Sequence, residues 1–384
     1  MGLSLSDRTA HITQAEIRVM TIECEKVGGV NLAQGVCDLG VPREVMEGTT
    51  DAIARGYNSY TRYDGLPELR EAISGKLLCF NGIHADPSTE VIVSAGSTGS
   101  FYCACLALLN PGDEVILFEP FYGYHVNTLL AANAVPRYVK MRSPDWRFDP
   151  ADLERAVTPR TKGIVVCTPG NPSGKVYDTQ ELRWVADFAT KHDLFIFTDE
   201  IYEYFVYDDR AHVSPLALDD IRDRTVMISG YSKTYSITGW RIGYSVSQAK
   251  WADAIGHVND LIYVCAPAPL QMGVAAGIGR LGPEYYASLR EEFRRKRDLL
   301  CAALKDVGLT PTVSQGAYYV LADVSHLPGA DSKQKAMHLL AVTGVASVPG
   351  SAFYVSETGD NLVRFCFAKK DAELEDACYR LRRL

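Results

Sequence analysis

The residues with the clearest potential for chemistry lie in one run, Ser-Gly-Tyr-Ser-Lys-Thr-Tyr-Ser-Ile-Thr-Gly-Trp-Arg-Ile-Gly, at positions 229–243. The amine of Lys233 in such a loop can hold a cofactor aldehyde as a Schiff base. The forked guanidinium of Arg241 can bind the phosphate of the same cofactor, and the hydroxyl of Ser232 can add a hydrogen bond. Most lysines are solvated surface charges, so this interpretation depends on what the rest of the chain places around Lys233.

A second polar cluster, Ser-Ala-Gly-Ser-Thr-Gly at positions 94–99, follows a short apolar run and opens a helical pattern. The backbone N–H groups from Gly96 onward, with the hydroxyls of Ser97 and Thr98, can bind a phosphate at a helix N-terminus. An ordinary helix cap is the simpler explanation of these residues when they are considered alone.

Two further clusters are turns, Glu-Pro-Phe-Tyr-Gly-Tyr at 119–124 and Thr-Pro-Gly-Asn-Pro-Ser-Gly at 168–174. The ring of Tyr122 can lie on a flat heteroaromatic cofactor, although a buried core tyrosine is the more common role. Asn171 can donate a hydrogen bond to a ring oxygen, whereas turn formation alone explains the neighbouring glycines and prolines.

The last cluster, Thr-Asp-Glu-Ile-Tyr at positions 198–202, also follows an apolar run. A carboxylate such as Asp199 can keep a pyridine nitrogen protonated, which is the arrangement found in enzymes that use pyridoxal phosphate. Helix capping is the alternative role for this aspartate. Tyr202, three residues further on, shares its helical face and can reach the same ring.

These clusters must be positioned by regular elements between about residues 90 and 246, where short apolar runs alternate with helical patterns. Continuous apolar runs predict strands that are covered on both faces, as in a largely parallel sheet, and the region therefore reads as an α/β layered domain. Ligands bind beyond the carboxyl ends of such strands, where all five clusters lie. The expected strands are Val91–Val93, Glu114–Phe118, Gly163–Cys167, Leu194–Phe197, Val226–Ile228 and Ile242–Val246, and the expected helices include Gly99–Leu109 and Thr179–His192.

The flanking regions predict a smaller α+β domain built from both ends of the chain. We expect an N-terminal segment over residues 1–45, a large α/β domain over 46–280 and the C-terminal part of the small domain over 281–384. The patterns that suggest this are an amphipathic stretch at Thr13–Lys26, an apolar run at Val30–Leu32, a charged helix at Pro283–Val307, strands at Tyr318–Leu321, Val345–Val348 and Leu362–Phe367, and a closing helix from Asp371.

The amino-acid composition limits the classes of molecule that the protein can bind. The 384 residues are 47% apolar with a net charge of −8, which argues against nucleic acid or an anionic membrane as the main partner. No apolar run approaches the roughly 20 residues of a membrane span, and no secretory signal pattern opens the chain. The ten cysteines are scattered among apolar residues, which predicts reduced thiols, no metal site and a cytoplasmic location.

Taken together, the clusters resemble the class I aminotransferases, enzymes of pyridoxal-phosphate fold type I, over nearly the whole chain. The most specific matches are Asn-Pro-Ser-Gly at 171–174, Asp-Glu-Ile-Tyr at 199–202, and Ser-Lys at 232–233 with Gly-Trp-Arg at 239–241. The resemblance implies a largely parallel seven-stranded-type sheet with pyridoxal 5′-phosphate held by Lys233. It further implies that Asp199 pairs with the ring nitrogen, Asn171 and Tyr202 with the ring oxygen, and Tyr122 with the ring face.

The resemblance also assigns the remaining contacts. Gly96, Ser97, Thr98, Ser232 and Arg241 are expected to bind the phosphate. Tyr60, which precedes Gly-Leu-Pro-Glu-Leu-Arg at 65–70, is expected to reach the phosphate of a partner subunit, which implies a homodimer with a shared active site. For the substrate, Arg364 is expected to bind the α-carboxylate, with Asn171 beside it, while the segment at Gly35 closes over the bound molecule.

Two positions depart from the family pattern. Cys37 stands where relatives commonly have proline, which puts the closure of its segment in doubt. Gly230 stands where some members have a phosphate-binding serine, for which Ser229 or Ser232 would have to compensate.

Three functions fit the resemblance to different degrees. An aminotransferase would move the amino group of an L-amino acid to a 2-oxo acid by a ping-pong mechanism, with the freed Lys233 amine as the base at Cα. The alternative on the same scaffold is a C–S β-lyase that releases pyruvate and ammonia. A cofactor-binding transcriptional regulator is a weaker alternative, because it needs a DNA-binding module ahead of this fold and the chain is acidic.

The sequence says least about the side chain of the substrate. Its pocket is expected to draw on residues near Thr13–Arg18, Tyr63 and Ile262–Tyr263, and on the partner subunit. These residues are mostly apolar or aromatic, which favours hydrophobic or aromatic amino acids. Arg18 is the exception, since a flexible arginine there would admit a second carboxylate.

Overall fold

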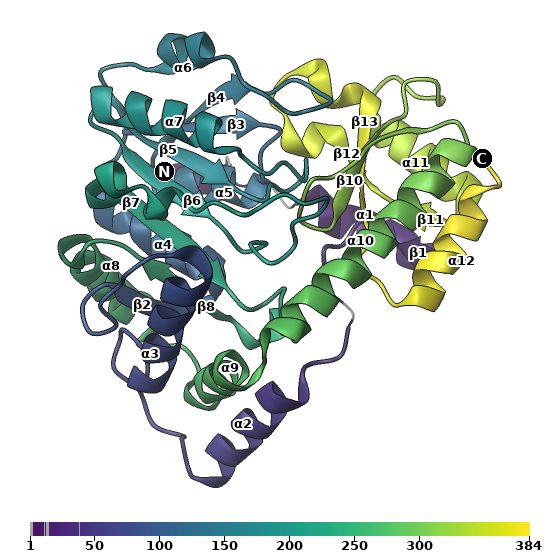
Figure 1. Cartoon of the computed structure of the whole chain (residues 1–384). Helices are drawn as coiled ribbons and strands as arrows, with labels where there is room; N and C mark the ends of the chain where they lie inside the picture. Colours follow the sequence, from purple (N-terminus) through teal and green to yellow (C-terminus); the bar gives the residue numbers. More distant parts are fainter. Residues whose placement is uncertain (1–2, 11, 13–14, 38) are drawn as a thin grey trace.

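The computed structural model describes residues 3–10, 12, 15–37 and 39–384, and it is organised around a central seven-stranded sheet (Figure 1). All neighbouring strands of this sheet are parallel except around β8, which runs antiparallel to both of its neighbours. In spatial order the strands are β2 (Val91–Ala95), β8 (Ile242–Val246), β7 (Thr225–Gly230), β6 (Phe195–Asp199), β5 (Thr161–Cys167), β3 (Glu114–Glu119) and β4 (Val135–Lys140). The predicted largely parallel α/β architecture is confirmed.

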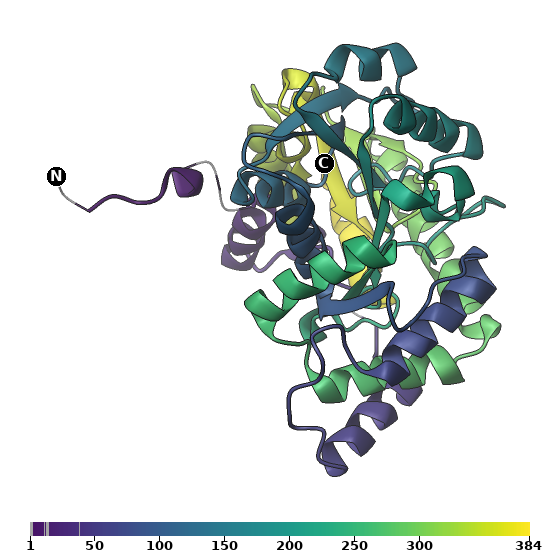
Figure 2. The same ribbon diagram turned by 90° about the vertical axis from the view of Figure 1, so that its left-hand side faces the viewer.

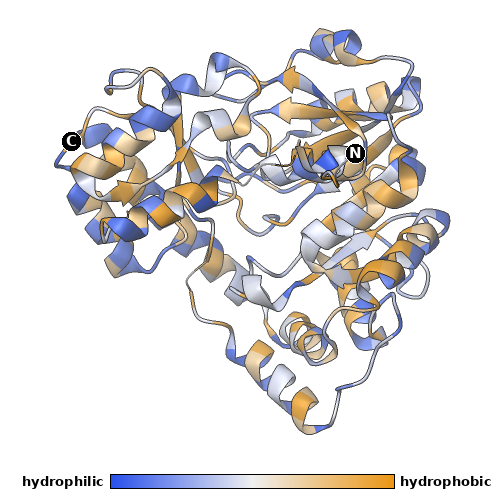
Figure 3. Ribbon diagram, turned by 180° about the vertical axis from the view of Figure 1, so that it is seen from behind, coloured by the Kyte–Doolittle hydropathy of each residue, from blue (hydrophilic) through white to orange (hydrophobic). Residues whose placement is uncertain are grey.

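Both faces of the sheet are covered by helices, which explains why the inner strands are apolar at every position. In β3, Val115 and Leu117 belong to one apolar cluster, while Ile116 and Phe118 belong to the cluster on the opposite face. The first face packs on α4 (Gly96–Leu108), α5 (Gly123–Ala131) and α8 (Ala249–Tyr263), and the second on α6 (Pro150–Ala156) and α7 (Thr179–Lys191). The strands accordingly stand out as hydrophobic ribbons in Figure 3.

A helical layer packs at the β2 end of the sheet. It consists of α2 (Arg43–Ala54), α3 (Pro67–Lys76) and α9 (Ala268–Arg280). Glycines allow α2 and α9 to approach closely, because a Cβ on Gly48 would meet the methyl group of Ala276 at 2.5 Å. The outer face of α2 leaves Met46 and Ile53 exposed.

The smaller part of the molecule joins the two ends of the chain. Its four-stranded sheet has the order β12 (Val348–Pro349), β13 (Leu362–Cys366), β10 (Tyr319–Asp323) and β9 (Thr310–Thr312). A separate parallel pair links β1 (Val30–Asn31) to β11 (Val345–Ala346). Helices α1 (Glu16–Lys26), α10 (Pro283–Asp306), α11 (Ser332–Thr343) and α12 (Asp371–Leu381) complete this part, which lies beside the central sheet in Figures 1 and 2.

Short helical turns complete the connections: η1 (Asp7–Ala10), η2 (Leu77–Asn81), η3 (Pro215–Ala217), η4 (Asp219–Arg224), η5 (Thr238–Trp240), η6 (Gly350–Phe353) and η7 (Glu357–Asn361). Among the described residues, no helix is long and apolar enough to span a membrane.

Two expectations about elements need correction. The run Val345–Val348, expected as one strand, divides into β11 and β12, which pair in different sheets. Strand β4 was not expected, because an edge strand with exposed positions lacks a continuous apolar run. The domain boundaries at residues 45 and 280 stay a prediction.

Candidate active site

A cavity of about 440 Å³ lies at the carboxyl ends of the central strands, and this size suits a small organic ligand. It is lined by nine predicted site residues, namely Ser97, Thr98, Tyr122, Asn171, Asp199, Tyr202, Ser232, Lys233 and Arg241. Each of the five polar clusters therefore contributes to one cavity. The convergence follows from the topology, since parallel strands bring their carboxyl ends to one edge of the sheet.

Lys233 is the amine inside this cavity. Its Nζ atom donates a hydrogen bond to the carbonyl oxygen of Gly35 at 3.2 Å and lies 6.0 Å from the ring centre of Tyr318. Burial disfavours the charged ammonium and lowers the pKa of Lys233 from its ordinary 10.5 to about 8. The lowered pKa gives Lys233 a much larger uncharged fraction near neutral pH than an ordinary lysine has, and the uncharged amine is the form that acts as a nucleophile or base.

Asp199 is the carboxylate that lines the cavity, and it comes from the end of β6. Its Oδ2 atom lies 2.8 Å from Nε2 of His125, while Oδ1 accepts a hydrogen bond from the backbone N–H of Ile201 at 3.3 Å. His125 stands in the first turn of α5, three residues after Tyr122. The imidazole holds the carboxylate in place from the side of α5.

An anion cradle forms where α4 begins. The residue before the helix, Ala95, gives no side-chain cap to the first N–H groups. Gly96 has the left-handed φ of +78°, and a Cβ there would collide with the guanidinium of Arg241. A Cβ on Gly243 would likewise collide with the backbone of Gly96 and Ser97. Glycines at these two positions thus bring an arginine against an uncapped helix N-terminus, which is the arrangement that binds phosphate.

The neighbouring cluster Ser229–Ser232 contributes one hydroxyl to this cradle. Ser232 lines the cavity, whereas the hydroxyl of Ser229 turns away and donates to the carbonyl of Glu200 and the carboxylate of Glu203, both at 3.3 Å. Of the two serines expected to compensate for Gly230, only Ser232 is in position.

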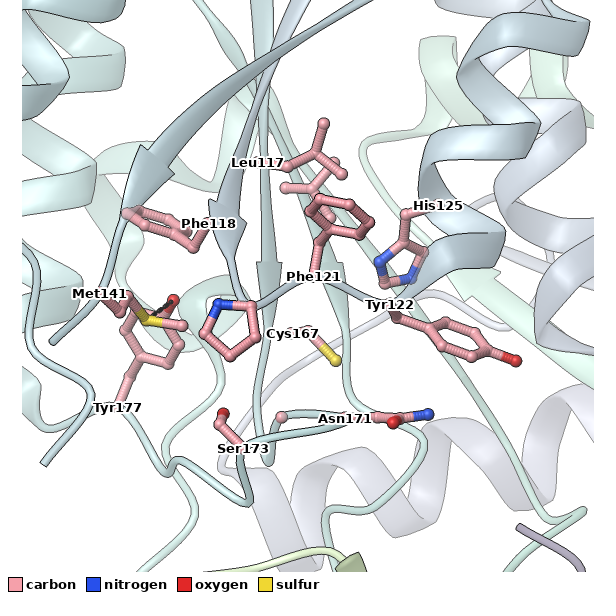
Figure 4. Close-up of a pocket in the computed structure, with 13 residues that line it drawn as sticks. Leu117, Phe118, Phe121, Tyr122, His125, Met141, Cys167, Asn171, Ser173 and Tyr177 are labelled. Carbon is pink, nitrogen blue, oxygen red and sulfur yellow. Dashed lines mark hydrogen bonds between the residues drawn. The ribbon is translucent and has the colours of Figure 1, made fainter. Parts of the chain in front are cut away.

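Tyr122 and Asn171 project toward the same side of the strand ends in Figure 4, with Cys167 between them. The same two residues also line a mostly apolar pocket together with Phe118, Phe121 and other core side chains. The Oδ1 atom of Asn171 accepts a hydrogen bond from Arg364, which leaves the amide nitrogen of Asn171 as its donor end.

Tyr202 completes the set around the cavity floor. Its hydroxyl lies 2.8 Å from the hydroxyl of Tyr319, and burial raises the pKa of Tyr202 well above its ordinary value. The phenol therefore stays protonated and remains available as a hydrogen-bond donor.

Arg364 is fully buried beside the cavity rather than on its surface. Its Nη1 atom donates to Asn171 at 2.8 Å and its Nη2 atom to the carbonyl of Ala33 at 2.6 Å, while Nε has no hydrogen-bond partner among the described residues. The guanidinium lies 4.3 Å from the ring centre of Tyr319 and 5.1 Å from that of Phe353. An arginine this deeply buried with an unpartnered N–H is equipped to receive a carboxylate.

Some predicted residues lie outside the cavity lining. Tyr60 is 82% exposed, as expected of a residue that would serve a partner subunit. Gly35 contributes its carbonyl oxygen, which accepts from Lys233 and from the hydroxyl of Tyr318. In the expected side-chain pocket, Arg18 lines the cavity, Tyr63 and Ile262–Tyr263 do not, and Thr13 lies outside the described residues.

Two residues at the cavity are absent from the sequence-based predictions. His125 lies one position beyond the cluster at 119–124, and its spacing of three from Tyr122 along a helix was the available signal. Tyr319 comes from β10 in the smaller part, 117 positions from its partner Tyr202, and no local pattern links them.

Cys37 is buried and close to the lysine loop. Its sulfur accepts a hydrogen bond from the hydroxyl of Ser236 at 3.1 Å, and burial raises the pKa of its thiol. The thiol of Cys37 is therefore neutral, and its hydrogen bond links the segment after Gly35 to the loop that carries Lys233.

One buried group outside the cavity has the residue types of a metal site, although no metal was expected. Ligand atoms of Glu200, Glu203 and His212 lie within 4.8 Å of one another. Lys76 already pairs with Glu203 at 2.5 Å and Ser214 donates to Glu200 at 2.7 Å, so protein groups occupy these carboxylates.

Comparison with known proteins gives consistent results. The sequence model of the family described as "Aminotransferase class I and II" matches residues 27–381. Kynurenine–oxoglutarate transaminase 3 of Mus musculus is 37% identical over 91% of this chain and 83% of its own length. Methionine aminotransferase of Escherichia coli is 33% identical over 92% of each chain. The solved structure of N-succinyldiaminopimelate aminotransferase from Mycobacterium tuberculosis superposes with a TM-score of 0.95 at 33% identity, over 98% of this chain and 99% of that one.

Proposed function

The chain belongs to the class I and II aminotransferase family, and on that premise we propose that it moves the amino group of an L-amino acid to a 2-oxo acid by a ping-pong mechanism. The observation that supports this most is the meeting of three features in one cavity: the Lys233 amine with its lowered pKa, the Asp199 carboxylate and the anion cradle at α4.

Enzymes of this family use pyridoxal 5′-phosphate, and the residues of the cavity fit that cofactor. The cradle of Gly96, Arg241 and the α4 N-terminus, with the hydroxyls of Ser97, Thr98 and Ser232, would hold the phosphate. Tyr122 would lie on the ring, Asp199 would face the ring nitrogen, and Asn171 and Tyr202 would donate to the ring oxygen. When bound, the cofactor supplies an aldehyde that accepts an amino group and a ring that accepts electrons from Cα.

Lys233 has two tasks in this proposal. Its amine would hold the cofactor covalently, and the same nitrogen would act as the base that removes the proton from Cα of the substrate. The lowered pKa suits both tasks, because both require the uncharged amine. The hydrogen bond from Nζ to Gly35 is the contact that must break as the amine moves.

Arg364 orients the substrate. Its buried guanidinium has an unpartnered Nε atom and would pair with the α-carboxylate, with Asn171 beside it. Fixing the carboxylate also fixes the direction of the Cα–H bond relative to Lys233, which lowers the entropic cost of proton transfer.

A second copy of the chain would complete the site. Tyr60 is 82% exposed on a stretch between α2 and α3, and we propose that it binds the cofactor phosphate of the partner subunit in a homodimer. Sedimentation of the holoenzyme tests the assembly, and a Tyr60→Phe variant with unchanged cofactor affinity would exclude the contact.

The same residues would also support a C–S β-lyase, because both reactions begin with the same proton transfer. The named relatives act in transamination of kynurenine, methionine and N-succinyldiaminopimelate, so transamination is the better supported of the two. Incubating the holoenzyme with amino acids and no 2-oxo acid separates them. A single turnover without ammonia release supports the aminotransferase, whereas sustained release of ammonia and pyruvate from a cysteine conjugate establishes the lyase.

A further inference from the structure

The hydroxyl of Tyr319 has no task in the proposed mechanism, although it touches a residue that does. It comes from β10 in the smaller part of the molecule and lies 2.8 Å from the hydroxyl of Tyr202, one layer behind the cavity lining. Tyr319 is 2% exposed and Tyr202 is 3% exposed. Because both hydroxyls are buried, they depend on each other for hydrogen bonding, and only one of them can donate in their shared bond.

The number of protons available decides the direction of this bond. A phenol has a single O–H group to donate, and in the proposed site Tyr202 needs its own for the ring oxygen of the cofactor. Tyr318, whose ring meets that of Tyr202 edge-on at 5.0 Å, already donates to the carbonyl of Gly35 at 3.1 Å. Tyr319 is therefore the phenol that remains to donate to Tyr202.

The surroundings of Tyr319 hold its hydroxyl in this position. Its strand, β10, is paired on both sides, with β13 and with β9. The guanidinium of Arg364 lies 4.3 Å from the ring centre of Tyr319, and a Cβ on Gly35 would collide with its hydroxyl. Burial raises the pKa of Tyr319, and the positive charge of Arg364 opposes that rise. The phenol thus keeps its proton, while the nearby cation strengthens its O–H group as a donor.

We propose that Tyr319 is a positioning residue whose hydroxyl donates to the oxygen of Tyr202 and so directs the O–H group of Tyr202 toward the ring oxygen of the cofactor. This inference rests on the proposed function. A phenol that accepts a hydrogen bond donates more strongly in turn. Tyr319 would thus help Tyr202 to stabilise negative charge on the ring oxygen, which lowers the pH at which the linkage between cofactor and Lys233 loses its proton.

Spectral titration of the holoenzyme with pH tests this direction of donation. The absorption band of pyridoxal phosphate on a lysine changes when the linkage loses its proton, so the midpoint pH reports how well the negative ring oxygen is stabilised. Tyr202→Phe removes the direct donor and should raise the midpoint by about one pH unit or more. Tyr319→Phe keeps the ring and its packing, and should raise the midpoint by about 0.3 unit, since accepting one bond strengthens a donated bond by roughly 10–30%.

A double variant separates positioning from general damage. With Tyr202→Phe in place, the hydroxyl of Tyr319 has nothing to support, so adding Tyr319→Phe should leave the midpoint where Tyr202→Phe sets it. Tyr286→Phe is the matched control, because it breaks another tyrosine–tyrosine hydrogen bond of 2.8 Å, with Tyr235, outside the cavity lining. This control should leave the midpoint unchanged. Every variant retains the charged and titratable neighbours of the two phenols, Tyr122, Tyr318, Cys366 and Arg364.

The sign of the shift in Tyr319→Phe decides the proposal. A lowered midpoint would mean that Tyr202 donates to Tyr319, and an unchanged midpoint would mean that the contact is only structural; either result overturns the inference. If Tyr202→Phe raises the midpoint in the same series, the proposed function stands without it. Wild-type protein that forms no lysine-linked absorption band with pyridoxal phosphate contradicts the proposed function itself, and this inference falls with it.

Discussion

Nε2 of His125 lies 2.8 Å from Oδ2 of Asp199, so a histidine from the first turn of α5 holds the carboxylate at the end of β6. This contact fixes the one acidic group that the described residues contribute to the cavity lining, at a defined place between two elements of the central sheet and its helices. It also separates two roles. Both residues line the cavity, but Asp199 would touch the cofactor, whereas His125 would act by positioning Asp199.

Replacing the two residues should therefore have unequal effects. Asp199→Asn removes the charge that would keep the ring nitrogen protonated, and we expect kcat to fall on the order of 10²-fold or more. His125→Gln removes one hydrogen bond to that charge, and we expect a fall of about tenfold. Steady-state kinetics with the absorption spectrum of the bound cofactor checks both, and equal effects of the two changes would contradict the assigned roles.

The anion cradle predicts that Gly96 cannot be replaced without a loss of cofactor affinity. Gly96→Ala should weaken pyridoxal phosphate binding at least about tenfold, because its Cβ would displace the Arg241 guanidinium and because the left-handed φ of +78° is strained for alanine. Gly75→Ala is the control, since a Cβ on this helical glycine meets no atom within 4 Å. Equilibrium titration of the cofactor measures both, and normal affinity in Gly96→Ala would show that the phosphate lies elsewhere.

The lowered pKa of Lys233 predicts a pH-dependent stability of the cofactor-free protein. Between pH 8 and 10.5 the unfolded chain binds more protons at this lysine than the folded chain does, so stability rises with pH across that window. Below pH 8 the folded protein bears the full cost of burying the charged ammonium, on the order of 3 kcal/mol of unfolding free energy.

Lys233→Met does not titrate and isolates this effect. The variant should exceed wild type in free energy of unfolding most below pH 8, and the excess should shrink as pH rises toward 10.5. Urea denaturation of both proteins at several pH values measures the difference. An excess that stays constant with pH would mean that Lys233 has an ordinary pKa.

We expect that lysine cannot replace Arg364 without a loss of activity. Arg364→Lys keeps the charge but loses the N–H groups that hold Asn171 and Ala33 and would bind the α-carboxylate. We expect kcat/KM to fall on the order of 10²-fold, with cofactor affinity nearly unchanged. A parallel loss of cofactor affinity would indicate a structural role in place of substrate binding.

The sequence predicted the core of the site because its residues follow strands, and parallel strands end at one edge of a sheet. Asp199 and Asn171 could be placed for this reason. Tyr319 could not, because its contact with Tyr202 joins the smaller part to the central sheet across 117 positions. The edge strand β4 was missed for a different reason: its outer positions face solvent, so its residues carry no continuous apolar signal.

The central claim is that Lys233 carries the cofactor, and chemical trapping tests it most directly. Borohydride reduction of the holoenzyme makes the bond between cofactor and lysine permanent, and mass spectrometry of the digested protein then locates it. We expect the added mass on the peptide that contains Lys233, and no added mass in Lys233→Ala, which should also lack turnover. Modification of another lysine, or near-normal activity of Lys233→Ala, would contradict the account.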